Sequence, residues 1–92
     1  MKNKRFYFIG IGGIGMSSIA RFLMQKGAEV AGYDKTSTPL TKALEDTGVQ
    51  ITYDASVETI PQGFETKETS VIFTPAVPAT HPQKHYFETQ GN

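Results

Sequence analysis

The residues of this 92-residue chain that are best suited to bind a ligand are four glycines near its start, at positions 10, 12, 13 and 15. They follow an apolar run at residues 6–9 and open a segment with helical spacing. A glycine turn between a strand and a helix is typical of sites that bind the diphosphate of a nucleotide. The unpaired N–H groups of the helix's first turn point at such an anion, helped by the helix dipole. No Lys or Arg lies between residues 10 and 20, so main-chain donors would have to hold the diphosphate.

Three of these glycines have separate expected roles. Gly10 lets the chain turn tightly out of the first strand, and Gly12 lacks the Cβ that would keep a diphosphate at a distance. Gly15 allows the helix to pack closely on the strand. The alternative is a tight turn that binds no ligand.

Asp34 is the second candidate for a binding residue. It stands at the carboxyl end of an expected strand at residues 29–33 and follows Gly15 by nineteen residues. In dinucleotide-binding folds an acidic residue about 20 positions after the glycines accepts hydrogen bonds from ribose hydroxyls. The alternative is an aspartate that shapes the turn at residues 35–37.

The elements that must position these residues alternate between strand and helix, which predicts an α/β domain. We expect a Rossmann-like, three-layer αβα fold with a mostly parallel sheet of four to five strands. The expected strands are residues 5–10, 29–33, 49–53 and 70–74, and the expected helices are residues 14–26, 39–47, a short one ending at 60, and 82–90.

The apolar spacing of these helices predicts which residues face inward. In the first helix, Met16, Ile19, Ala20, Leu23 and Met24 form the inner stripe, and Ser17 is turned away. In the second helix, which Thr38 caps, the inward residues are Leu40, Ala43 and Leu44. The last expected strand is left at an edge of the sheet. Two prolines in the segment 74–78 end that strand in a loop on the same edge as the glycine turn.

The composition limits the classes of function. Lys plus Arg and Asp plus Glu both number 9, so no overall field favours nucleic acid or an anionic membrane. The absence of cysteine excludes disulfides and thiolate metal sites and fits a cytoplasmic protein. We interpret the basic residues 1–5 as a solvated leader, and no apolar stretch approaches the ~20 residues of a membrane span. His81 and His85 are expected to be structural or solvated, so no catalytic residue and no metal ligand is assigned.

With the glycine turn, Asp34 and the loop at 74–78 in place, the chain resembles the N-terminal domain of the Mur ligases, which build the peptide stem of bacterial peptidoglycan. The resemblance covers all 92 residues and is most specific at residues 9–20, read IGIGGIGMSSIA. It is moderate at residues 32–34 and looser at 71–82. The form of the glycine turn resembles the first-acting branch of the family more than its later-acting members.

This resemblance implies a UDP-binding domain of a three-domain, ATP-dependent, amide-forming enzyme. The residues that would cradle the diphosphate of UDP-N-acetylmuramate are Gly12, Gly13, Ile14, Gly15, Met16 and Ser17. Asp34 and Thr41 would contact the uridine end. Thr74, Pro75 and Ala76 match a loop that is often Ser-Ser-Ala in the family, and His81-Pro82 matches a frequent Asn-Pro. These departures change the hydrogen-bond donors. The resemblance therefore supports the position of the loop more strongly than its individual contacts with a ligand.

The resemblance also implies what this part of the enzyme leaves to other domains. The phosphate loop GxxxxGK that ATP chemistry needs is absent from the 92 residues. We therefore expect this chain to bind and not to catalyse, with ATP and magnesium held by the remaining ligase domains. The chain stops after a helix that should lead into another strand, and we expect a fragment comprising one domain, residues 1–92, of a longer protein.

Two other functions stay open at this point. Gly10, Gly12, Gly15 and Asp34 also fit an NAD(P)-binding domain of a dehydrogenase or of a regulatory module. The continuation at residues 16–18 and the segment 74–77 favour the ligase. A pure interaction module would have no affinity for nucleotides.

Overall fold

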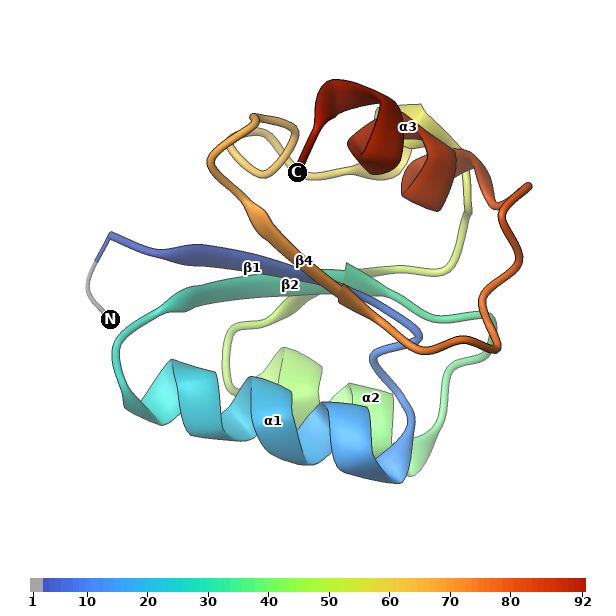
Figure 1. The fold of residues 1–92 in the computed structure, drawn as a ribbon. Coiled ribbons are helices and arrows are strands. Elements are labelled where there is room, and N and C mark those ends of the chain that lie inside the picture. The colour runs from blue at the N-terminus through green and yellow to red at the C-terminus, as the bar shows by residue number, and fades with distance from the viewer. Residues whose placement is uncertain (1–2) are drawn as a thin grey trace.

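The computed structural model describes residues 3–92 (Figure 1); residues 1 and 2 of the basic leader lie outside the described residues. Strands and helices alternate in the expected order. The elements are β1 (Arg5–Ile9), α1 (Ile14–Gln25), β2 (Glu29–Tyr33), α2 (Pro39–Asp46), β3 (Gln50–Thr52), the 3₁₀ turn η1 (Val57–Thr59), β4 (Ser70–Phe73) and α3 (Pro82–Gln90). The expected short helix is thus a single 3₁₀ turn, and the third strand is shorter than expected.

Within the described residues the four strands form one parallel sheet in the order β3-β2-β1-β4. Helices α1 and α2 cover one face of the sheet, and α3 covers the other (Figure 1). This arrangement confirms a Rossmann-like, three-layer αβα domain, with β4 at an edge. The register places Gly32 of β2 opposite Phe8 of β1, where a Cβ would lie 2.7 Å from the Phe8 carbonyl oxygen.

Two hydrophobic cores lie on the two faces of the sheet, and β1 supplies both. Phe8 and the partly buried Phe6 belong to the core under α1 and α2, whereas Tyr7 and Ile9 belong to the core under α3. Because both faces of β1 are covered, its sequence is continuously apolar rather than alternating. The carboxyl end of β1, where the glycine turn begins, is therefore packed against a core on each face of the sheet.

The inner face of α1 differs from the expectation at two positions. Ser17 is buried, with 2% of its surface exposed, whereas Ile19 is 45% exposed. Burial of Ser17 is tolerated because its hydroxyl donates to the Ile14 carbonyl oxygen at 3.0 Å. The prediction that Ile19 faces inward and Ser17 outward is therefore wrong. In α2, Ala43 is exposed, so the prediction that it faces inward is also wrong.

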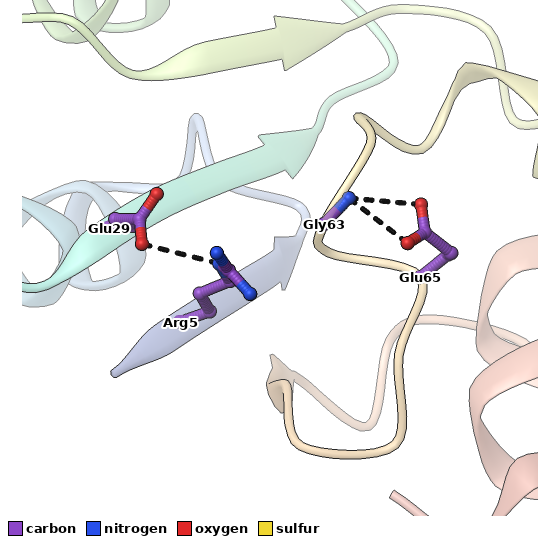
Figure 2. Close-up of polar contacts among 4 residues, drawn as sticks. All are labelled: Arg5, Glu29, Gly63 and Glu65. Atoms are coloured by element: carbon purple, nitrogen blue, oxygen red, sulfur yellow. Dashed lines mark hydrogen bonds and ion pairs between the residues drawn. The ribbon is translucent and has the colours of Figure 1, made fainter. Parts of the chain in front are cut away.

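The amino end of the sheet is fixed by surface polar contacts (Figure 2). Arg5 Nε lies 3.2 Å from Glu29 Oε2 and joins β1 to β2. Both side chains are about half exposed, so this ion pair contributes at most about 1 kcal/mol. In the loop between η1 and β4, the Gly63 N–H donates to both carboxylate oxygens of Glu65, at 3.0 and 3.1 Å. These contacts lie at the end of β1 opposite the glycine turn.

Candidate functional site

The glycine turn leaves β1 sharply and is fixed to the end of β2. Gly10 has φ +95°, a conformation that favours glycine, which confirms the expected tight turn. The N–H groups of Gly10 and Ile11 both donate to the Tyr33 carbonyl oxygen, at 2.8 and 3.0 Å. The side chain of Ile11 is fully buried. Tyr33 thus sets the position of the turn, a role that the sequence analysis missed.

Free N–H groups begin at the first residue of α1. Gly13 is the N-cap and has no side chain to cap the helix, and its carbonyl oxygen accepts from the Ser17 N–H at 2.7 Å. Among residues 3–92 no acceptor is found for the N–H groups of Ile14, Gly15 and Met16. The first turn also carries no acidic side chain. Three neighbouring donors at the positive end of a 12-residue helix are thus available to an anion.

Asp34 lies against the glycine turn. Its Oδ1 accepts from the Gly12 N–H at 3.0 Å, and its Oδ2 accepts from the Thr36 N–H at 3.2 Å. The second bond spans two residues and shapes the loop after β2, which confirms the turn interpretation of Asp34. A contact between Asp34 and a ribose stays a prediction.

The structure shows what a side chain at Gly12 or Gly15 would meet, and the expected approach of a diphosphate to Gly12 stays a prediction. A Cβ on Gly12 would lie 2.9 Å from Thr41 Cγ2 and 3.0 Å from Asp34 Cγ, so a side chain there would force one of these neighbours to shift. A Cβ on Gly15 would meet nothing within 4 Å. The expectation that Gly15 permits close packing of the helix on the strand is therefore wrong. Gly15 instead borders open space beside the free N–H groups.

Thr41 has a structural role. It is fully buried. Its hydroxyl oxygen accepts from the Thr38 N–H at 2.8 Å, and the hydroxyl donates to the Thr38 carbonyl oxygen at 3.0 Å. These bonds complete a capping box at the start of α2. No part of Thr41 is exposed in this structure, and its expected contact with uridine stays a prediction.

The loop after β4 lies at the same edge of the sheet as the glycine turn (Figure 1). Ile9 of β1 is paired with Phe73 of β4, so Gly10 and Thr74 leave neighbouring strands side by side. Thr74, Pro75 and Ala76 are exposed, and the Val77 N–H closes the loop on the Thr74 carbonyl oxygen at 3.1 Å. The expected location of this loop is confirmed, and its contacts with a ligand stay predictions.

His81 supports the same edge from the other face of the sheet. Its Nδ1 accepts from the Lys84 N–H at 3.4 Å and caps α3. Its ring meets the Tyr33 ring edge-on, with centroids 4.8 Å apart. Burial lowers the pKa of His81, which favours the neutral ring that this cap needs. These contacts confirm a structural role for His81, and His85 is exposed.

Two hollows within the described residues lie away from the glycine turn. A cleft of about 450 Å³ lies between η1 and α3, and its lining residues are Val57, Pro82, His85, Tyr86, Thr89 and Gln90. A smaller one of about 190 Å³ lies at the amino end of the sheet and includes Glu29 and Phe64. Neither is lined by residues 10–17. None of the helices within residues 3–92 is long and apolar enough to span a membrane.

The parallel sheet, with a glycine turn and free N–H groups at its first crossover, defines a Rossmann-like domain. Residues 5–91 match the family model described as "Mur ligase family, catalytic domain". The chain belongs to the Mur ligase family.

Three relatives that it resembles bear the name UDP-N-acetylmuramate--L-alanine ligase. That of Flavobacterium johnsoniae is 51% identical over 88% of this chain and 18% of its own length. That of Cytophaga hutchinsonii is 49% identical over 92% of this chain and 18% of its own. For Porphyromonas gingivalis W83 the identity is 46%, over 96% of this chain and 20% of the relative. The chain therefore spans about a fifth of the length of these relatives.

Proposed function

We propose that this chain is the UDP-sugar-binding domain of an ATP-dependent ligase that joins L-alanine to UDP-N-acetylmuramate in peptidoglycan synthesis. The observation that carries the proposal is the set of free N–H groups at Ile14, Gly15 and Met16. Their place at the carboxyl edge of a parallel sheet is where ligands of such folds bind. The names of the relatives supply the particular nucleotide sugar.

The role of the site in this proposal is to bind and orient the substrate. The diphosphate binds to the free N–H groups of Ile14, Gly15 and Met16, which are already positioned and need no reorganisation. Gly13 and Ser17 help by building the first turn of α1, since the Ser17 N–H is bonded to Gly13. The exposed loop at Thr74, Pro75 and Ala76 forms the other wall of the site.

Catalysis belongs to other parts of the enzyme in this proposal. The 92 residues contain no GxxxxGK sequence to hold the phosphates of ATP. The acidic side chain nearest the turn, Asp34, is bonded to main-chain N–H groups rather than free for a metal. ATP and magnesium would therefore be bound by the remaining domains of a cytoplasmic ligase, and this chain would be one binding domain of it.

An NAD(P)-binding domain is not favoured, because the relatives are ligases. The test is a titration of the ¹⁵N-labelled chain with UDP-N-acetylmuramate, UDP and NAD, followed by amide chemical shifts. We expect UDP-N-acetylmuramate to bind most tightly and to shift the amides of residues 12–17 most. A tighter response to NAD would overturn the proposal.

A further inference from the structure

We propose that Asp34 is a positioning residue that occupies the Gly12 N–H and thereby confines an incoming diphosphate to the N–H groups of α1. The ligand part of this inference rests on the function proposed above. The structural part concerns the free protein alone. In this inference Asp34 holds the Gly12 N–H rather than accepting hydrogen bonds from a ribose.

The first argument is where each donor of the turn is bonded. The N–H groups of Gly10 and Ile11 go to Tyr33, and that of Gly13 goes to the Gly10 carbonyl oxygen at 3.3 Å. The Gly12 N–H is the one donor of the turn whose acceptor is a side chain, Asp34 Oδ1 at 3.0 Å. The N–H groups of residues 10–13 are thus all bonded within the protein, and the free N–H groups begin at the first residue of α1.

The second argument is packing. Gly12 is held between Asp34 and the methyl group of Thr41, with no room for a Cβ. The other carboxylate oxygen of Asp34 is bonded to the Thr36 N–H at 3.2 Å. Asp34 therefore fastens the glycine turn to the loop that leads into α2. Since Thr41 is fixed in the capping box of that helix, the turn has rigid partners on both sides.

The third argument is charge. The carboxylate of Asp34 lies beside a site proposed for a diphosphate, and like charges repel. Holding the Gly12 N–H needs one acceptor oxygen, which asparagine also provides, although its amide nitrogen cannot accept from the Thr36 N–H. Asp34→Asn should keep the bond to Gly12 and remove the repulsion. If Asp34 instead bonded to ribose hydroxyls, its replacement would change the affinity only for ligands that contain a ribose.

The ligand-free experiment measures hydrogen exchange of the Gly12 amide. We expect its protection to be retained in Asp34→Asn and to fall about tenfold or more in Asp34→Ala, because alanine has no acceptor. Unchanged protection in Asp34→Ala would overturn the inference. If that variant fails to fold, the wild-type chain decides: a Gly12 amide that exchanges as fast as the free amides of Ile14, Gly15 and Met16 would overturn the inference.

The ligand experiment compares inorganic pyrophosphate with UDP by amide shift titration of the wild-type chain and Asp34→Asn. Both affinities should rise by the same factor, about 3- to 10-fold. Loss of UDP affinity with pyrophosphate affinity unchanged would overturn the inference in favour of a ribose contact.

The matched control is Asp54→Asn. Asp54 follows β3 at the same edge of the sheet and accepts from the Ser56 N–H at 2.9 Å, away from the glycine turn. This variant removes the same charge and should leave both affinities unchanged; a rise equal to that of Asp34→Asn would contradict a local role for Asp34. Failure of the wild-type chain to bind either probe would contradict the proposed function, whereas the exchange of Gly12 would still decide the role of Asp34.

Discussion

The hydroxyl of Tyr7 donates to Gln83 Oε1 at 2.7 Å, across the core between the sheet and α3. Gln83 is fully buried, and its Nε2 donates to the Ser56 carbonyl oxygen and to Thr59 Oγ1, both at 3.0 Å. These three hydrogen bonds therefore join β1, α3 and the segment around η1 inside an apolar layer. Burial raises the pKa of Tyr7, so its hydroxyl stays a donor throughout the neutral range.

Replacing Tyr7 by phenylalanine tests this contact. The change leaves Gln83 Oε1 buried without a donor, and we expect the free energy of unfolding to fall by about 1–3 kcal/mol. Urea unfolding followed by circular dichroism measures it. The control is Tyr53→Phe, since the Tyr53 hydroxyl bonds to Glu45 on the surface at 3.3 Å and its loss should cost less than about 0.5 kcal/mol. Equal losses in the two variants would argue against the buried pair.

Gly15 is the position at which a side chain tests the binding site without damaging the turn. A Cβ on Gly12 would press on Asp34 and Thr41, whereas one on Gly15 meets no protein atom within 4 Å. We expect Gly15→Val to keep the free energy of unfolding within about 1 kcal/mol of wild type, because valine is no worse than glycine in a helix. The affinity for UDP should fall about tenfold or more, since the side chain enters the space beside the free N–H groups.

The control for this variant is Ser18→Val, at an exposed position of the same helix, where UDP affinity should be unchanged. Isothermal titration calorimetry or amide shifts measure both affinities. Wild-type affinity in Gly15→Val would show that the ligand lies elsewhere.

His81 should make stability depend on pH. Its folded-state pKa is lowered by burial, so below the ordinary histidine pKa of about 6.5 the unfolded chain binds more protons than the folded one. The contribution of His81 to the free energy of unfolding is therefore complete above about pH 6.5. It declines as the pH falls toward the lowered pKa and levels off below that pKa. His81→Asn keeps an acceptor for the Lys84 N–H and should abolish this part of the pH dependence in thermal melts. A pH profile identical to that of wild type would contradict the assignment.

The order of the elements could be predicted from the sequence because it depends on local patterns. The continuous apolar run of β1, the Thr38 cap of α2 and the left-handed Gly91 after α3 each follow from a few neighbouring residues. The position of the glycine turn at the carboxyl edge also follows, since strand and helix fix its direction.

The details that could not be predicted depend on residues distant in sequence. The choice between Ser17 and Ile19 on α1 depends on how the helix packs against the rest of the domain, which its own spacing does not fix. The contact of Gly12 with Asp34 spans 22 residues, and that of Tyr7 with Gln83 spans 76. No local pattern contains such pairs, so glycine roles assigned from the motif alone were right for Gly10 and wrong for Gly15.

The central claim is that main-chain N–H groups at the start of α1 hold a diphosphate. The most direct measurement compares UDP with uridine, at equal concentrations, by the ¹H–¹⁵N shifts of Ile14, Gly15 and Met16. We predict saturable shifts of these three amides with UDP and none with uridine, because uridine lacks the anion. Equal shifts with both ligands, or shifts confined to the cleft that Val57 and Tyr86 line, would contradict the claim.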